Sequence, residues 1–244
     1  MQAKFSKFAS GKKVFQMIKE RISELVSNLP SGVQLVAVSK FHPLEAVLEA
    51  YGAGQRIFAE SRPQELLSKV NALDTNAYPD LQWHFIGHLQ TNKLKMVLPY
   101  VDMVQSVDSL NLLSQIDSWA LKNPLPGGSA RKVKVLLELH IAAESSKQGF
   151  VEEEILDILF RHELFKGVEF CGLMGMATNT DCEEDIRADF ARISSFMEYL
   201  QYLFPELEEF RELSIGMSDD WKIALDYGAT MVRIGSAIFG PRQP

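Results

Sequence analysis

The stretch Leu35-Val36-Ala37-Val38-Ser39-Lys40 begins with an unbroken apolar run and ends on a lysine. An apolar run of this length is typical of a parallel strand that is buried on both faces. Pro43 follows shortly afterwards, and proline is favoured in the first turn of a helix. The stretch therefore predicts a strand followed by a helix, with Lys40 at the junction.

The same pattern recurs along the chain. Alternating strands and helices with short connections favour a parallel sheet, and eight repeats that use the whole chain favour a closed barrel. We expect residues 1–244 to form a single α/β domain, a (β/α)8 TIM barrel with an extra N-terminal helix over 12–28. The expected strands are Leu35–Val38, Arg56–Ala59, Trp83–Ile86, Asp102–Gln105, Lys134–Leu139, Gly167–Cys171, Leu213–Ile215 and Met231–Ile234.

Composition and charge exclude several classes of function. The net charge of -7 and the lack of a Lys/Arg-rich run disfavour nucleic-acid binding. No stretch has the roughly 20 apolar residues that a membrane span needs, and no signal-type segment is recognisable, so we expect a cytoplasmic protein. Cys171 and Cys182 form no C-x-x-C pair and are interpreted as reduced thiols. No extended exposed apolar surface is predicted, so we expect a monomer.

Functional residues of a β/α barrel lie where the strands end. Alternation along the first expected strand places Val36, Val38 and Lys40 on one face. The two β-branched residues suit a barrel interior, which predicts that the Lys40 amine lies at the mouth. The alternative is a lysine beyond the strand that simply extends into water.

Two glycine- and serine-containing turns follow the last two expected strands. The segment R-I-G-S-A-I-F-G contains Gly235, which permits close approach of a ligand, and Ser236, where a short helix is predicted to start. Barrels frequently bind phosphate at this position. The segment S-I-G-M-S-D-D-W adds Gly216 and Ser218, although Ser218 is equally suited to cap a helix. Together the turns predict a phosphate pocket opposite Lys40.

Arg233 lies two residues before Gly235, so alternation places both on the face toward the barrel interior. An arginine cannot lose its charge and needs an acceptor there. A pyridine nitrogen would serve as that acceptor. An ion pair with Glu60 or Glu138 is the structural alternative.

These segments, in order, resemble the pyridoxal phosphate (PLP) homeostasis protein family, whose members are single-domain relatives of the alanine racemase barrel. The resemblance runs from about Val33 to Gly240 and is carried by A-V-S-K, W-H-F-I-G-H-L-Q-T-N-K, S-S-K-Q-G-F, G-L-M-G-M-A, L-S-I-G-M-S-D-D-W and R-I-G-S-A-I-F-G. It implies a barrel of the alanine racemase type with PLP as its cofactor. The cofactor-binding residues that it implies are Lys40, which forms the Schiff base, Ser218, Gly235 and Ser236 around the phosphate, Arg233 against the pyridine ring, and Met217 and Asn92.

The resemblance and the local sequence suggest different roles for some positions. Asn92 resembles a residue that lines the mouth, but a polar role at a helix start is the alternative. Lys147 resembles a secondary PLP attachment point, with a solvated loop lysine as the alternative. Met174 and Met176 are expected to line the barrel near the ring. The family usually reads F-G-E-N where this chain has Phe58-Ala-Glu-Ser61, so a contact made by that asparagine is shortened or lost.

The resemblance also bears on activity. Alanine racemase takes its second catalytic base from another domain, whereas here the barrel uses essentially the whole chain. We therefore expect a protein that holds PLP for storage, delivery or protection, without turnover, and whose partners are PLP and, transiently, PLP-dependent apoenzymes. One alternative is a PLP-dependent amino-acid racemase or related enzyme that uses Tyr51, Tyr227, His84 or His88. Another is an aldolase in which Lys40 reacts with a phosphorylated sugar. No metal is expected, because His84 and His88 have no further ligands beside them.

Overall fold

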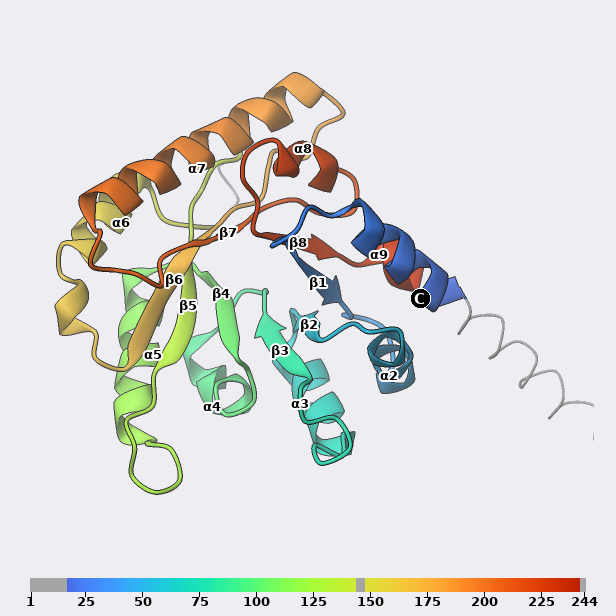
Figure 1. The fold of residues 1–244 in the computed structure, drawn as a ribbon. Coiled ribbons are helices and arrows are strands. Elements are labelled where there is room, and N and C mark those ends of the chain that lie inside the picture. Colours follow the sequence, from blue (N-terminus) through green and yellow to red (C-terminus); the bar gives the residue numbers. More distant parts are fainter. Residues whose placement is uncertain (1–16, 144–147, 242–244) are drawn as a thin grey trace, which may run out of the picture.

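The computed structural model describes residues 17–143 and 148–241 (Figure 1). Within these residues eight parallel strands close into a barrel in sequence order, and β8 returns to pair with β1. The predicted (β/α)8 barrel is therefore confirmed. The strands are β1 (Gln34–Val38), β2 (Ile57–Glu60), β3 (Gln82–Phe85), β4 (Met103–Val107), β5 (Val133–Glu138), β6 (Val168–Met174), β7 (Glu212–Ser214) and β8 (Met231–Ile234).

The helices lie around the outside of the strands (Figure 1). A leading helix over 17–28 lies beside the short last helix, where Arg21 Nη1 donates to the Ile238 carbonyl at 3.0 Å. Residues 12–16 of the predicted leading helix lie outside the described residues. The other helices are α2 (Leu44–Gly52), α3 (Pro63–Ala72), η1 (Thr91–Lys93), α4 (Leu94–Val97), α5 (Leu110–Lys122), α6 (Glu152–Leu159), η2 (His162–Leu164), α7 (Glu183–Leu203), α8 (Trp221–Leu225) and α9 (Ser236–Phe239).

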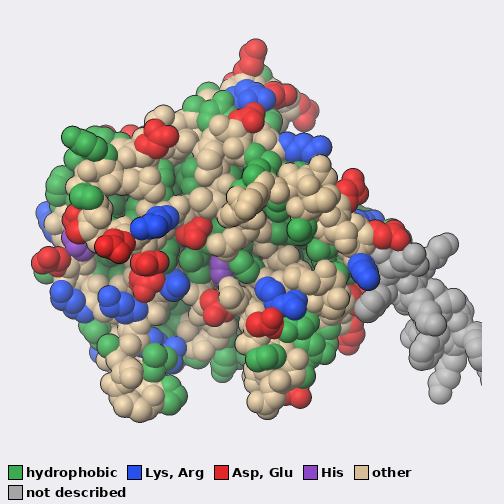
Figure 2. All heavy atoms as spheres, viewed as in Figure 1, with side chains coloured by type: hydrophobic (Ala, Val, Ile, Leu, Met, Phe, Trp, Pro, Cys, Tyr) green, Lys and Arg blue, Asp and Glu red, His purple; other side chains and the backbone are tan. Residues whose placement is uncertain are grey.

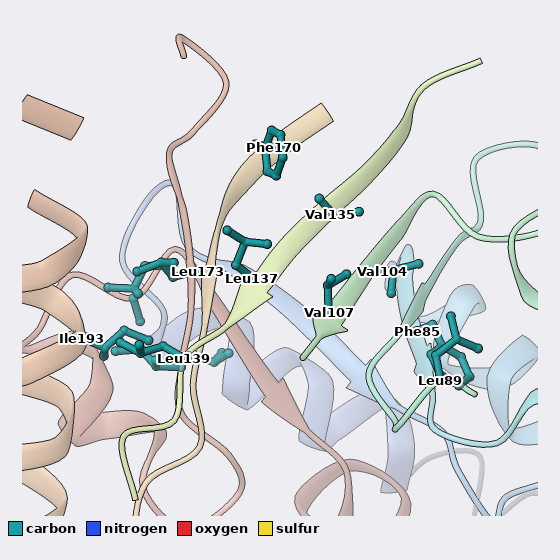
Figure 3. Close-up of a cluster of buried hydrophobic side chains, with 14 of the residues drawn as sticks. Phe85, Leu89, Val104, Val107, Val135, Leu137, Leu139, Phe170, Leu173 and Ile193 are labelled. Atoms are coloured by element: carbon teal, nitrogen blue, oxygen red, sulfur yellow. The ribbon is translucent and has the colours of Figure 1, made fainter. Parts of the chain in front are cut away.

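Side-chain alternation divides the apolar residues into two clusters. The larger one fills the layer between strands and helices, and part of it is drawn in Figure 3, with Phe85, Val135 and Leu173 among its members. The smaller one lies inside the barrel and includes Val36 and Val38. The alternation predicted for the first strand is thus confirmed, and it places the residues at the ends of the strands around one mouth.

Strand β6 continues three residues past the end that the sequence pattern predicts at Cys171. Gly172 interrupts the apolar run of β6, yet the strand continues to Met174 through a shift of register against β5. The φ of Gly172 is 147°, and a Cβ there would lie 1.9 Å from the Glu212 carbonyl oxygen. The glycine is therefore a bulge that lets two backbones approach closely.

The charged surface, the helix lengths and the two cysteines bear on the classes of function that the composition disfavours. On the face in Figure 2, Lys and Arg side chains are interspersed with Asp and Glu and form no continuous basic patch. Within the described residues, no helix combines the length and apolar character that crossing a membrane requires. Cys171 is buried and Cys182 is exposed, and neither forms a disulfide. Burial raises the pKa of the Cys171 thiol to about 12.

Candidate functional site

A cavity of about 310 Å³ lies at the carboxyl ends of β1, β6, β7 and β8. This volume falls at the lower end of the range for small-molecule sites. Polar groups and methionine side chains share its wall. The lining residues are Val38, Lys40, Phe41, His42, Ile86, Met174, Met176, Met217, Ser218, Asp219, Arg233, Gly235, Ser236 and Gly240.

The half-buried Lys40 is held at this wall by the residue before it. Ser39 Oγ donates to Glu60 Oε1 at 2.6 Å, and Lys69 Nζ donates to the Ser39 carbonyl at 2.8 Å. The next residue, Phe41, has a φ of 67°, which a non-glycine residue rarely adopts, and its N–H donates to Glu65 Oε2 at 2.9 Å. The residues on both sides of Lys40 are thus held by polar contacts from β2 and α3.

The turns after β7 and β8 meet on the same cavity. Gly216 has a φ of 89° and no room for a side chain, because a Cβ would lie 2.7 Å from the Ala224 side chain. The Gly235 N–H donates to Ser218 Oγ at 3.4 Å, so the two turns are joined directly. The N-cap of α8 is Asp220, and Ser218 therefore does not serve as the helix cap that its sequence position also allowed.

Arg233 is the most deeply buried charged group on the cavity wall, with a 4% exposed side chain. Its Nη1 donates to the Ser214 carbonyl at 2.6 Å and to Ser214 Oγ at 2.7 Å, and its Nη2 donates to the Gly175 carbonyl at 2.8 Å. These are three of the five N–H bonds of a guanidinium, and the described residues supply no acceptor for the others. Burial lowers its pKa to about 10, so Arg233 stays charged at neutral pH.

Neither carboxylate that the sequence offered as an ion-pair partner binds Arg233. Glu60 instead pairs with Lys69, whose Nζ lies 2.5 Å from Oε1. Glu138 ends β5 and is 5% exposed. Burial, reinforced by the charge of Asp108, raises the pKa of Glu138 to about 7, while Arg233 and His88 act in the opposite direction.

Comparison with known proteins identifies the family. Residues 15–243 match the alanine racemase, N-terminal domain, family. The chain is 36% identical over 216 residues to the pyridoxal phosphate homeostasis protein of Vibrio alginolyticus, with 88% of each chain covered. It is 38% identical over 239 residues to the Homo sapiens protein of the same name, covering 93% of this chain and 84% of that protein. The chain belongs to the pyridoxal phosphate homeostasis protein family.

A solved structure agrees with this assignment. PipY of Synechococcus elongatus, determined with PLP bound, has a TM-score of 0.80 and 37% identity to this chain, and the match covers 91% of this chain and 100% of PipY. The fold of this member of the pyridoxal phosphate homeostasis protein family is therefore the alanine racemase type of barrel.

Six of the seven residues that the family resemblance assigned to the cofactor line the cavity. These six residues are Lys40, Met217, Ser218, Arg233, Gly235 and Ser236. Asn92 is exposed in η1 and lines a different hollow, together with His88 and Asp108. Lys147 lies outside the described residues. Met174 and Met176 lie on the cavity wall, as expected.

The acid or base candidates of the racemase alternative lie elsewhere. Tyr51 donates from its hydroxyl to Asp80, and Tyr227 packs beside Phe190, with ring centroids 6.4 Å apart. His84 is buried inside the barrel, and His88 Nδ1 lies 2.8 Å from an oxygen of Asp108. None of the four candidates lines the cavity.

Sequence reasoning missed two titratable residues of the cavity wall. His42 stacks on Phe239 with ring centroids 5.1 Å apart, and its pKa is lowered by burial and by the charge of Lys69. Asp219 is the other missed residue. The only available signal was proximity to motif residues, since His42 follows Lys40 by two positions and Asp219 follows Ser218.

Proposed function

We propose that the chain binds PLP in this cavity as a Schiff base on Lys40 and acts in PLP homeostasis without turnover of its own. Ser218, Gly235 and Ser236 would hold the phosphate, and Arg233 would lie against the ring nitrogen. Met174, Met176 and Met217 would supply apolar surface around the ring. When bound, PLP supplies an aldehyde that a lysine amine can hold reversibly.

The observation that carries the proposal is the buried guanidinium of Arg233. Two N–H bonds of this charged group have no acceptor among the described residues. The group lies on the wall of a cavity that Lys40 also lines. A guanidinium can only donate hydrogen bonds, so an acceptor held in the cavity would complete those of Arg233. A ligand with an unprotonated ring nitrogen supplies such an acceptor, and the pyridine ring of PLP offers one.

The turn after β8 fits the other end of such a ligand. A Cβ at Gly235 would lie 3.1 Å from the Val38 carbonyl oxygen, so only glycine fits against β1 without displacement. Ser236 is exposed at the start of α9, and Ser218 is half-buried beside it. Hydroxyl and backbone N–H groups are the donors that phosphate oxygens require.

Arg233 also supports a role without turnover. A guanidinium that stays charged leaves a ring nitrogen unprotonated, and this makes the cofactor a weak electron sink. The chain's residues would then bind and orient PLP while leaving it poorly activated. The PLP homeostasis proteins that the chain resembles carry the same functional name across bacteria and mammals.

The central test is borohydride reduction of the purified, PLP-treated protein, followed by peptide mass spectrometry. We expect a pyridoxyl adduct on Lys40 and its loss in Lys40→Ala. Lys166→Ala, which removes an exposed lysine beyond η2, is the control and should retain the adduct. An adduct found only on other lysines, or on none, would overturn the proposal.

The absence of turnover is tested separately by exchange of the α-hydrogen of small amino acids in deuterated water. We expect exchange at the rate of free PLP. Steady exchange that disappears in Lys40→Ala would instead show an enzyme. His42→Gln would then test the imidazole on the cavity wall as the second acid or base.

A further inference from the structure

A chain of buried polar side chains runs from Arg233 across the inside of the barrel. Arg233 Nη1 lies 2.7 Å from Ser214 Oγ, Ser214 Oγ lies 2.8 Å from Gln105 Oε1, and Gln105 Nε2 lies 2.8 Å from His84 Nδ1. All four side chains are at most 4% exposed. They come from β8, β7, β4 and β3, so the chain crosses the interior between strands on different sides of the barrel.

The chemistry of the groups sets the direction of these hydrogen bonds. Arginine only donates, so Ser214 Oγ must accept from it. The single hydroxyl hydrogen of Ser214 is then available for Gln105 Oε1, which accepts. The amide of Gln105 consequently presents its nitrogen to His84, and Nδ1 of His84 must accept.

A second contact agrees with this orientation of the amide. Gln105 Nε2 lies 3.6 Å from Met231 Sδ, and a thioether sulfur accepts hydrogen bonds but cannot donate them. Both N–H bonds of the amide nitrogen therefore have acceptors. If the Gln105 amide were flipped, its oxygen would face the Met231 sulfur, and two acceptors would be in contact. Ser214 Oγ would then face two donors, the Arg233 guanidinium and the Gln105 amide nitrogen.

The end of the chain is consistent with the same direction. His84 that accepts at Nδ1 must be neutral, with its hydrogen on Nε2. Burial lowers the pKa of His84 to about 4, which keeps it neutral at physiological pH. The chain thus begins at a permanent charge and ends at an imidazole that is fixed in one tautomer.

We propose that Gln105 is a positioning residue which, through Ser214, holds the Arg233 guanidinium so that its remaining N–H bonds face the cofactor ring nitrogen. Because Arg233 is one of the groups assigned to PLP above, this role rests on the proposed function. Gln105 does not line the cavity and acts only through Ser214 and Arg233. Its effect on PLP is therefore confined to the ring nitrogen and leaves the phosphate contacts unchanged.

The first experiment examines the chain in the PLP-free protein. Nitrogen-15 NMR of the imidazole separates a bare ring nitrogen from one that carries hydrogen, and we expect Nδ1 of His84 to be bare and Nε2 to carry the hydrogen. In Gln105→Glu the second carboxylate oxygen cannot donate to Nδ1, so the His84 resonances should move toward a protonated Nδ1. A hydrogen on Nδ1 in the unaltered protein would overturn the proposal, even if no variant folds.

The second experiment uses PLP labelled with nitrogen-15 in its ring. We expect Gln105→Met to shift the ring-nitrogen resonance and to raise the dissociation constant of PLP about tenfold, the effect of roughly one hydrogen bond. Gln55→Met is the matched control. Gln55 is also a buried glutamine, and its Nε2 donates to the Leu35 and Ile57 carbonyls, both at 2.6 Å, before β2 begins.

The outcomes separate the two proposals. An unchanged ring-nitrogen resonance in Gln105→Met, or an equal shift in Gln55→Met, would overturn the positioning role while PLP binding stands. A wild-type protein that takes up no PLP would overturn the proposed function and the positioning role together. The His84 resonances still report the direction of the hydrogen-bond chain in that case.

Discussion

Replacing Glu138 by glutamine should stabilise the protein, and by more at high pH than at low pH. The carboxyl is 5% exposed and its pKa is raised from 4.5 to about 7, chiefly by burial. Between these pH values the folded protein keeps a proton that the unfolded chain has lost. Stability therefore falls as pH rises through this window, and the full cost is present above about pH 7.

The pKa difference sets the size of the effect. At about 1.4 kcal/mol for each pH unit, ionising Glu138 in the folded state costs roughly 3 kcal/mol. Glutamine keeps the shape and carries no charge. Glu138→Gln should therefore have a higher free energy of unfolding than the wild type. This gain should be roughly 2–3 kcal/mol larger near pH 8 than near pH 5.

Urea unfolding of both proteins at the two pH values measures this difference, and the comparison cancels every other group that titrates in the same way in both. Glu163→Gln removes an exposed carboxylate and serves as the control, with little change expected at either pH. A difference independent of pH, or a variant less stable than the wild type near pH 8, would refute the reasoning. It would mean that Arg233 stabilises an ionised Glu138.

Three further predictions concern the strands and the cavity. Gly172→Ala should lower the free energy of unfolding by about 2 kcal/mol or more, as measured in urea, because its φ is strained for alanine and its Cβ would collide with the Glu212 carbonyl; an unaffected variant would show that β6 can shift. Lys69→Met should lower the free energy of unfolding by about 3–5 kcal/mol, because it leaves the buried Glu60 without its ion-pair partner. Adding Glu60→Gln should recover part of that loss. Equal stability of the single and double variants would contradict this. Ser236→Ala should speed the loss of PLP on dialysis and leave its absorption spectrum nearly unchanged, since the hydroxyl would contact the phosphate and not the ring; equal retention would indicate that backbone N–H groups suffice.

The barrel and most of the candidate site could be predicted because their signals are local. The apolar run before Lys40 and the helical pattern after it lie within a few residues of each other, and their alternation fixes which side chains face inward. The glycines and serines after β7 and β8 are equally local signals. Strand order then follows from the regular connections, so the site residues converge once the barrel is accepted.

What could not be predicted depends on contacts between distant parts of the chain. Gly172 reads as a strand end, and only its register against β5 shows it to be a bulge. Gln105 carries no motif, and its importance comes from contacts with β7 and β3. Asn92 lies in a motif that predicted the mouth, but the short helix η1 before α4 places it in a different hollow.

The pairing of β8 with β1 brings together Arg233, which lies opposite Val36 in the register, and Lys40, which lies just beyond β1. Both residues line the cavity. These strands are the first and last to be synthesised. The cavity therefore forms only when β8 pairs with β1 and closes the barrel. A ligand that contacts both β1 and β8 would bind only to the closed barrel. Bound PLP would therefore oppose separation of these two strands.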